Sequence, residues 1–349
     1  MRAGTVRIGP LEVPRAGEVV VIAEAGVNHD GNPELAHRLV DVAADARADA
    51  VKFQTFDPHR LVSAAADATP YQRARGSAAD QRSLLASLTL PSSAWAELRD
   101  HAAERGIQFL STPFDLGSAE LLVELGVPAL KVSSGELTNT PFLRQLATFG
   151  VPLLVSTGMG SAAEVAAAVE ACAQAPGTVL FHCVSAYPAP LDQCNLRAIP
   201  VMAQAHGLPV GWSDHTTGVT SALGAVALGA AVLEKHVTTD RTRRGPDHAA
   251  SLEPDGLATY VEQCRALARA LGDGVKRRVP AEEENAALVR RSWHAARDLG
   301  PGTVLTADDV VLLRPEGGAA PGQVLVGRRV RATVAAGAPL RLADLEGTA

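Results

Sequence analysis

The feature that most constrains this chain of 349 residues is a repeated alternation of short apolar segments with alanine-rich amphipathic ones. Eight apolar segments are predicted as buried strands: 19–25, 50–56, 108–114, 129–136, 152–158, 178–184, 209–216 and 232–238. Each precedes a segment with helical spacing of its apolar residues: 34–46, 94–106, 117–126, 141–150, 162–175, 196–207, 220–229 and 256–271. Apolar strands separated by helices indicate a parallel sheet covered on both faces. Eight such units over about 250 residues predict an α/β protein with a (β/α)8 TIM barrel.

Nearly every predicted strand becomes polar at its carboxyl end, which favours a barrel over an open sheet. In a barrel, the carboxyl ends of all the strands meet at one face, where active sites are built. An open doubly wound sheet would concentrate its site at a single switch point instead. The polar residues are Glu24, Lys52, Gln54, Thr112, Lys131, Ser133, Glu136, Ser156, Thr157, Ser185, Ser213, His215, Glu234 and His236.

The end of the chain has a different pattern. We assign residues 1–275 to the barrel and 276–291, which hold basic residues, a proline and an acidic run, to a linker. Residues 292–349 contain short β-like runs with Gly and Pro turns, and are predicted to form a small β-rich domain. A domain of about sixty residues is marginal in size but able to fold or to dock on a partner.

Composition argues against several functional classes. A net charge of −6 argues against a nucleic-acid or anionic-membrane surface. The apolar run 19–23 is too short for a secretory signal, and the uncharged stretch 216–233 is interpreted as a buried helix and strand. The four cysteines show no CxxC spacing, so we expect a reducing, cytoplasmic setting.

Two strand ends carry the residues that point most directly to catalysis. Ser213 and His215 share one face of a strand, and Glu234 and His236 share one face of the next, because side chains two apart point the same way. Two imidazoles beside a carboxylate suit a divalent metal with open positions for substrate. The alternative is that both are hydrogen-bonded core histidines.

Lys52 and Lys131 lie inside apolar strands, where a lysine is costly unless it meets an anion or loses its charge. The anion is either a bound phosphate or carboxylate, or the carboxylates of Glu24 and Glu136. A Schiff base with a carbonyl substrate is a third possibility. Glu24 and Glu136 are in turn candidates for acid and base catalysis.

Two loops are interpreted as covering the site. The segment 245–254, with GPDH followed by SLEP, is predicted to be a ligand lid, although Gly-Pro-Asp is also ordinary turn chemistry. Tyr187 follows the sixth strand and either covers a sugar or closes the top of the barrel.

Several motifs together resemble the sialic acid synthases, meaning N-acetylneuraminate synthase and its legionaminate and pseudaminate synthase relatives. The C-terminal segment resembles the antifreeze-like (SAF) domain that these enzymes append. The resemblance covers nearly the whole chain and agrees in motif order and spacing. It rests on IAEAGVNHDGNPELA, DAVKFQTF, FLSTPFD, LKVSSGELTNTPFL, VSTGM, HCVSAYPAP, GWSDHT, LEKH and GPDHAASLEP.

The resemblance implies a metal-dependent transferase that condenses phosphoenolpyruvate with an open-chain N-acetylhexosamine, N-acetylmannosamine or a related sugar. The products would be a nonulosonic (sialic-type) acid and phosphate. In family terms His215 and His236 would hold Mn²⁺ or Mg²⁺. Our own candidates for shuttling a proton near the aldehyde and for steering water are Glu24 and Glu136. The residues expected at phosphoenolpyruvate are Lys52, Lys131, Ser134, Ser156, Ser185 and Ser213; those expected at the sugar are Gln54, Tyr187, Glu234, Asp247 and Arg314. Thr112 is expected to bind substrate.

Two positions depart from the family pattern. Ser185 stands where some members carry Asn, and the run after Arg314 is richer in Gly and Ala than is usual, so the detail of phosphate and sugar contacts is open. We expect small-molecule partners only, and a two-fold homodimer in which each small domain brings Arg314 to the other chain's barrel. The alternative is a surface arginine that acts within its own chain.

Two rival functions stay open at this point. One is a Schiff-base aldolase that uses Lys52 or Lys131. The other is a non-catalytic carbohydrate-binding or ice-binding protein whose small domain is the functional part. The sequence names neither the hexosamine nor the metal.

Overall fold

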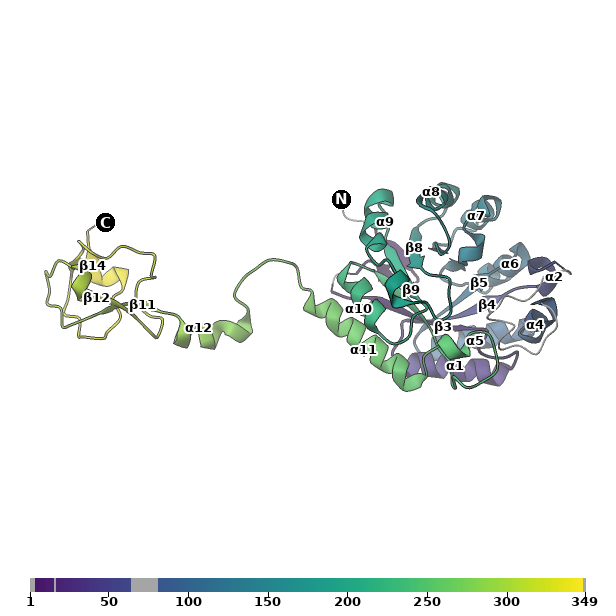
Figure 1. Ribbon diagram of the computed structural model, residues 1–349, viewed down its shortest axis with the longest axis horizontal. Helices are drawn as coiled ribbons and strands as arrows, with labels where there is room; N and C mark the ends of the chain where they lie inside the picture. Colours follow the sequence, from purple (N-terminus) through teal and green to yellow (C-terminus); the bar gives the residue numbers. More distant parts are fainter. Residues whose placement is uncertain (1–3, 16, 64–80, 348–349) are drawn as a thin grey trace. The chain divides into compact units, whose positions relative to one another are not determined.

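The computed structural model describes residues 4–15, 17–63 and 81–347, and the chain divides into two compact units, Met1–Asp273 and Gly274–Ala349. In the first unit eight parallel strands close into a barrel, in the order β10, β3, β4, β5, β6, β7, β8, β9. Figure 1 labels five of them, β3, β4, β5, β8 and β9. The predicted α/β TIM barrel is therefore confirmed. Within the described residues, no helix has the length and apolar composition needed to cross a membrane.

Every predicted strand is present. The bounds are β3 Val20–Gly26, β4 Ala50–Thr55, β5 Gln108–Pro113, β6 Leu130–Val132, β7 Leu153–Ser156, β8 Thr178–Cys183, β9 Val210–Asp214 and β10 Val232–His236. The largest difference is in the predicted strand 129–136, which stops at Val132 and continues as a 3₁₀ turn, Ser134–Glu136. Ser133 causes the change, because its hydroxyl accepts a hydrogen bond from the Gly135 N–H and so competes with strand pairing.

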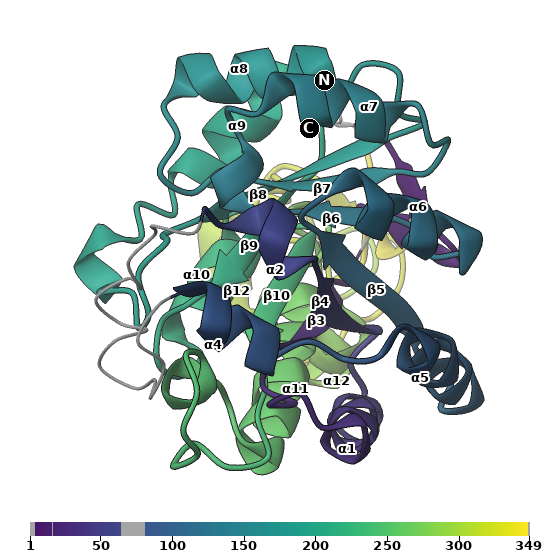
Figure 2. The ribbon, with the colours of Figure 1, turned by 90° about the vertical axis from the view of Figure 1, so that its right-hand side faces the viewer.

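The eight predicted helices surround the strands (Figure 2). Asn32, Asp115, Asn139 and Ser161 begin four of them by accepting a hydrogen bond from a backbone N–H of the first turn. Their bounds are α1 Pro33–Asp45, α5 Ser92–Glu104, α6 Leu116–Glu124, α7 Thr140–Ala147, α8 Ala162–Ala171, α9 Ala198–His206, α10 Thr220–Ala227 and α11 Pro254–Ala270.

Two features of the first unit were not predicted. An antiparallel hairpin, β1 Val6–Ile8 with β2 Leu11–Val13, buries Val6, Ile8 and Val13 against residues at the amino ends of the barrel strands. This hairpin closes the bottom of the barrel. Two short helices, α2 Pro58–Leu61 and α4 Gln81–Ser87, lie in front of the strands in Figure 2.

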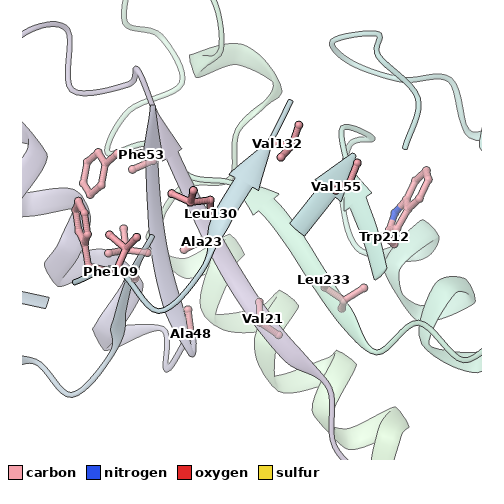
Figure 3. Packing of buried hydrophobic residues seen from close by; sticks show 14 of the residues in the cluster. Val21, Ala23, Ala48, Phe53, Phe109, Leu130, Val132, Val155, Trp212 and Leu233 are labelled. Carbon is pink, nitrogen blue, oxygen red and sulfur yellow. The ribbon is translucent and has the colours of Figure 1, made fainter. Parts of the chain in front are cut away.

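Alternation along the strands divides the barrel core into two layers. Phe53, Phe109 and Leu130 pack outward against the helices with many other apolar side chains (Figure 3). Ile22, Leu110, Leu154 and Phe181 fill the interior instead. The interior positions nearer the carboxyl ends are polar, so the strands carry a buried polar layer above an apolar one.

The second unit contains two small antiparallel pairs, β11 Ser292–Ala295 with β12 Val310–Leu313, and β13 Arg329–Val330 with β14 Leu345–Glu346. Its core is formed by Ala295, Leu299, Leu305, Ala319, Leu325, Val330, Leu340 and Leu345. The segment 276–291, predicted as a linker, holds a 3₁₀ turn, Pro280–Glu282, and a short helix, α12 Glu283–Val289, on which no side chain is buried.

Candidate active site

A cavity of about 650 Å³ opens at the carboxyl ends of the barrel strands. It brings together all the predicted site residues of the barrel except Glu136, which is not among the described residues that line it. The predicted residues in its wall are Glu24, Lys52, Gln54, Thr112, Lys131, Ser134, Ser156, Ser185, Tyr187, Ser213, His215, Glu234, His236 and Asp247.

Two lysines and two glutamates form a buried charge network in this cavity. Lys52 Nζ lies 2.7 Å from Glu24 Oε2 and 3.8 Å from Glu234 Oε2, and it donates to Thr112 Oγ1 at 2.9 Å. Lys131 Nζ lies 3.9 Å from Glu234 Oε1, and Ser213 Oγ donates to the same oxygen at 2.9 Å. Glu234, rather than the expected Glu136, is therefore the carboxylate that the lysines share.

Glu136 is held elsewhere. It lies on the 3₁₀ turn Ser134–Glu136, and its carboxylate accepts a hydrogen bond from Asn139 Nδ2 at 2.7 Å. Because the strand ends before this turn, the alternation that would place Glu136 inside the barrel no longer applies.

The pKa values of the two glutamates are shifted in opposite directions. Burial raises the pKa of Glu24 to about 7, although Lys52 opposes the shift. Burial would also raise the pKa of Glu234, but the charges of Lys131 and Lys52 and the hydrogen bond from Ser213 hold it below the ordinary value. Glu234 is therefore an anion at neutral pH, while Glu24 is poised to take up or release a proton.

The two histidines are neutral and face each other. His215 Nδ1 donates to the Val184 carbonyl at 2.7 Å, which leaves its Nε2 to accept. His236 Nδ1 is buried, and no described residue gives it a hydrogen-bond partner. The ring centroids are 5.5 Å apart, and burial lowers the pKa of both imidazoles.

These two imidazoles are the side chains of the cavity that could hold a metal ion. A buried histidine nitrogen without a partner is unusual unless a ligand occupies it, and a neutral imidazole is the form that binds metal. Within the described residues, no group of three or more His, Cys, Asp or Glu side chains is arranged so that it could hold a metal ion. The protein would thus supply two nitrogen ligands and leave the other positions to water and substrate.

Hydroxyl groups line the part of the cavity near Lys131. Lys131 Nζ donates to Ser156 Oγ, and the Gly158 N–H donates to Ser134 Oγ at 3.0 Å. A Cβ at Gly158 would lie 2.3 Å from Ser185 Oγ and 2.8 Å from Ser134 Oγ, so a side chain there would displace both hydroxyls. Gly158 was not among the predicted site residues, although its place at the end of the predicted strand 152–158 was a usable signal.

Asp247, Gln54 and Glu24 meet around Gly26. Gln54 Nε2 donates to Glu24 Oε1 at 3.1 Å, and Asp247 Oδ2 lies 4.0 Å from His236 Nδ1. A Cβ at Gly26, which has φ +54°, would lie within 3.7 Å of all three side chains. Burial raises the pKa of Asp247 to about 6.

The cavity also has an apolar side that the sequence analysis did not identify. It is formed by Val27, Phe56, Leu61, Val62, Leu85, Leu88, Phe114 and Met159. Met159 is 76% exposed and has φ +64°, a backbone conformation that few residues other than Gly, Asn and Asp adopt. Arg314 lies in the second unit, exposed, directly after β12.

A buried ion pair joins the two histidine-bearing strands on their helix-facing side. Lys235 Nζ lies 3.3 Å from Asp214 Oδ2, and both side chains are fully buried. Asp214 Oδ1 accepts from the Thr216 N–H and hydroxyl, and Tyr260 OH donates to Asp214 Oδ2. Lys235 also donates to the Thr216 carbonyl. The pair therefore fixes the backbone on both sides of His215 and directly before His236.

Fold and site together define a TIM-barrel enzyme whose cavity concentrates buried charges and neutral imidazoles at the carboxyl ends of the strands. The NeuB family model matches residues 39–276, and the SAF domain model matches residues 290–346. The chain belongs to the NeuB family and carries a C-terminal SAF domain. The resemblance noted in the sequence is thus confirmed.

The relatives are named synthases. The chain is 41% identical over 306 residues to N,N'-diacetyllegionaminic acid synthase of Campylobacter jejuni, covering 86% of this chain and 92% of that one. It is 35% identical to human N-acetylneuraminate-9-phosphate synthase, covering 90% and 89%. The crystal structure of an N-acetylneuraminic acid synthetase from Leptospira borgpetersenii superposes with a TM-score of 0.71 at 33% identity, covering 81% and 95%. The protein is therefore an enzyme, a synthase of this family.

Proposed function

We propose that the enzyme condenses phosphoenolpyruvate with an open-chain N-acetylhexosamine to give a nonulosonic acid and phosphate. The observation that carries the proposal is the single cavity in which two lysines and several hydroxyls adjoin two neutral imidazoles. The first group suits an anionic donor and the second suits a metal-assisted carbonyl acceptor. The names of the relatives support a product of the sialic or legionaminic acid class.

The donor would lie at the lysine side of the cavity. Lys131, Ser134, Ser156 and Ser185, with the space that Gly158 leaves, offer a cation and hydroxyl donors to a phosphate. Lys52, Thr112 and Ser213 lie beside them and would bind the carboxylate. A bound dianion would also offset the desolvation cost of the two buried ammonium groups.

His215 and His236 would hold the divalent ion, Mn²⁺ or Mg²⁺. When bound, the metal would polarise the aldehyde oxygen of the sugar. Imidazole ligands alone favour softer ions such as Zn²⁺, but water and substrate oxygens at the remaining positions shift the preference towards Mn²⁺ or Mg²⁺. Gln54, Tyr187, Glu234 and Asp247 would orient the sugar, since all four line the cavity.

The chemistry requires one proton and one water. The enol carbon of phosphoenolpyruvate forms a bond to the aldehyde carbon, and the former aldehyde oxygen takes a proton. We assign this proton transfer to Glu24, which can hold a proton near neutral pH. Water then adds at the cationic carbon, and the tetrahedral intermediate expels phosphate to leave the ketone. Glu136, on the turn beside Ser134, stays our candidate for steering that water, although it lies outside the cavity wall.

We further propose that the enzyme is a cytoplasmic homodimer. All four cysteines are buried, and none forms a disulfide in the described structure, which supports a reducing compartment. Each SAF domain would bring Arg314 to the partner's barrel, where a guanidinium suits sugar oxygens. Mixing Arg314→Ala with His236→Ala protein tests this arrangement, because a heterodimer would regain one intact site. Subunit exchange without regained activity would refute it.

A Schiff-base aldolase is less well supported. Lys52 and Lys131 face buried carboxylates, which stabilise their charged, non-nucleophilic form, even though burial lowers the pKa of Lys131. A protein that only binds carbohydrate does not require a glutamate that exchanges a proton near neutral pH, in the same cavity as two neutral imidazoles. Both rivals make different predictions from the synthase.

The deciding experiment measures phosphate release from phosphoenolpyruvate with a panel of N-acetylhexosamines, and identifies the product by mass spectrometry. The synthase should release one phosphate per nonulosonic acid formed, and EDTA should stop it. An adduct trapped by borohydride and resistant to EDTA would indicate the aldolase. Tight sugar binding without phosphate release would indicate a binding protein.

A further inference from the structure

A second polar cluster lies outside the cavity, in the loop 238–253 that joins β10 to α11 and carries Asp247. Its centre is His248, which is fully buried. His248 Nδ1 lies 2.7 Å from Thr238 Oγ1, and His248 Nε2 lies 3.0 Å from Asp30 Oδ1. Arg243 donates to Asp30 Oδ2 through Nε at 3.0 Å and a terminal nitrogen at 2.8 Å. Asp30 thus forms hydrogen bonds with two residues of this loop, Arg243 and His248.

Asp30 belongs to a different part of the chain, the loop between β3 and α1, where it adopts φ +52°. Asn28, two residues earlier in the same loop, adds a second connection. Its Nδ2 donates to the Val237 carbonyl at 2.8 Å and to Ser251 Oγ at 2.9 Å. Ser251 Oγ in turn donates to the Asp247 carbonyl at 2.7 Å. The backbone of Asp247 is therefore tethered on one side, and its neighbour His248 is tethered on the other.

The packing around His248 has little tolerance. A Cβ at Gly245 would lie 2.7 Å from His248 Cδ2, so a side chain at position 245 would collide with the ring. The loop backbone therefore passes close to His248, and a movement of the ring would disturb the Gly245–Asp247 segment.

We propose that Asp30 and His248 act as positioning residues, a latch that holds the loop 238–253 in the conformation that places Asp247 beside His236. Neither residue touches the cavity. Their effect on catalysis would pass through Asp247, and this part rests on the proposed function, in which Asp247 faces the acceptor sugar. Without the latch, the loop would lose a charge-assisted contact on each side of the Gly245–Asp247 segment.

The test variant is Asp30→Asn, because Asn keeps the shape and also tolerates the left-handed backbone at this position. His248→Gln is the second variant, and it removes the latch from the loop side. Asp240→Asn is the matched control: it changes a carboxylate of the same loop whose side chain, among the described residues, accepts hydrogen bonds from Thr242 and makes none to Asp30 or His248. Thermal unfolding of all three shows which are folded.

The first readout is limited trypsin digestion without substrate, with the cuts mapped by mass spectrometry. The loop offers cleavage sites at Arg241, Arg243 and Arg244, and two of these are already exposed. Loss of a charge-assisted hydrogen bond should raise cutting at these sites by about tenfold to a hundredfold in Asp30→Asn and His248→Gln, with no change in the control. Wild-type resistance in both folded variants would overturn the latch.

The second readout is the Michaelis constant of each substrate in phosphate release. Both latch variants should raise the constant for the sugar by about tenfold and leave that for phosphoenolpyruvate within about twofold. Faster cleavage with an unchanged sugar constant would overturn the positioning role. If the wild-type protein releases no phosphate with any sugar, the proposed function fails, while the trypsin result still decides whether the latch exists.

Discussion

The buried Lys235–Asp214 pair predicts a specific pattern of stability. Replacing Lys235 with Met keeps the apolar stem but leaves Asp214 as an uncompensated charge in a fully buried position. Breaking such a pair costs about 3–5 kcal/mol of unfolding free energy. Asp214 retains hydrogen bonds from the Thr216 N–H, the Thr216 hydroxyl and Tyr260 OH, so we expect a loss near the lower limit, about 3 kcal/mol.

The double variant Asp214→Asn with Lys235→Met separates charge from packing. It removes both charges and keeps an acceptor for Thr216, so its stability should return to within about 1 kcal/mol of wild type. Urea unfolding gives these free energies, with fluorescence following the buried Trp212 of the same strand, β9. In a thermal melt, the Tm of the single variant Lys235→Met should be lower than that of the wild type by roughly 6–12 °C.

The outcome that refutes this reasoning is a double variant no more stable than Lys235→Met. The loss would then come from the missing lysine contacts and not from a stranded carboxylate. A single variant with wild-type stability would show instead that the interior around Asp214 is polar enough to accept the lone charge.

Three further predictions concern the cavity. His236→Ala should weaken Mn²⁺ binding by at least tenfold in a paramagnetic titration of the substrate-free protein, and unchanged binding would remove His236 from the metal site. Because the pKa of Glu24 is about 7, its proton is present below that pH; activity that depends on donation should fall as pH rises through 7. The Glu24→Gln variant should have a low reaction rate, and its activity should not fall as pH rises through 7. A fall that remains in this variant would assign the proton to another group. Lys131→Ala should raise the Michaelis constant of phosphoenolpyruvate far more than that of the sugar; equal effects would make Lys131 structural.

Much of the barrel and its site could be predicted because strand alternation is a local property. Once 209–216 and 232–238 are recognised as strands, the shared faces of Ser213 with His215 and of Glu234 with His236 follow from the two-residue period. The structure places all four in the wall of one cavity. The sequence predicted the pair of Lys52 with Glu24 but not that both lysines share Glu234, because reach across a barrel depends on how neighbouring strands are staggered.

Most of the features that could not be predicted from the sequence lie in loops and turns. Glu136 was expected at the carboxyl end of its strand, with the other residues of the site, but a Ser133 hydrogen bond ends the strand before it. The contact between Asp30 and His248 joins residues 218 positions apart through two irregular loops, and no periodic pattern records it. The hairpin β1–β2 is too short for periodicity to distinguish it from a loop.

The way the barrel closes has a consequence for how the chain is made. Strand β3 pairs with β10, which begins at Val232, and the hairpin buries Val6 and Ile8 against residues as distant as Val179 and Val232. The hairpin and β3 therefore leave the ribosome before the barrel strand that covers them, and β3 keeps an unpaired edge until β10 is made. Such long-range pairing is slow, so the nascent chain is most prone to aggregate just before His236 is synthesised. A truncation before β10 should consequently be insoluble, whereas removal of the SAF domain should leave a barrel that closes.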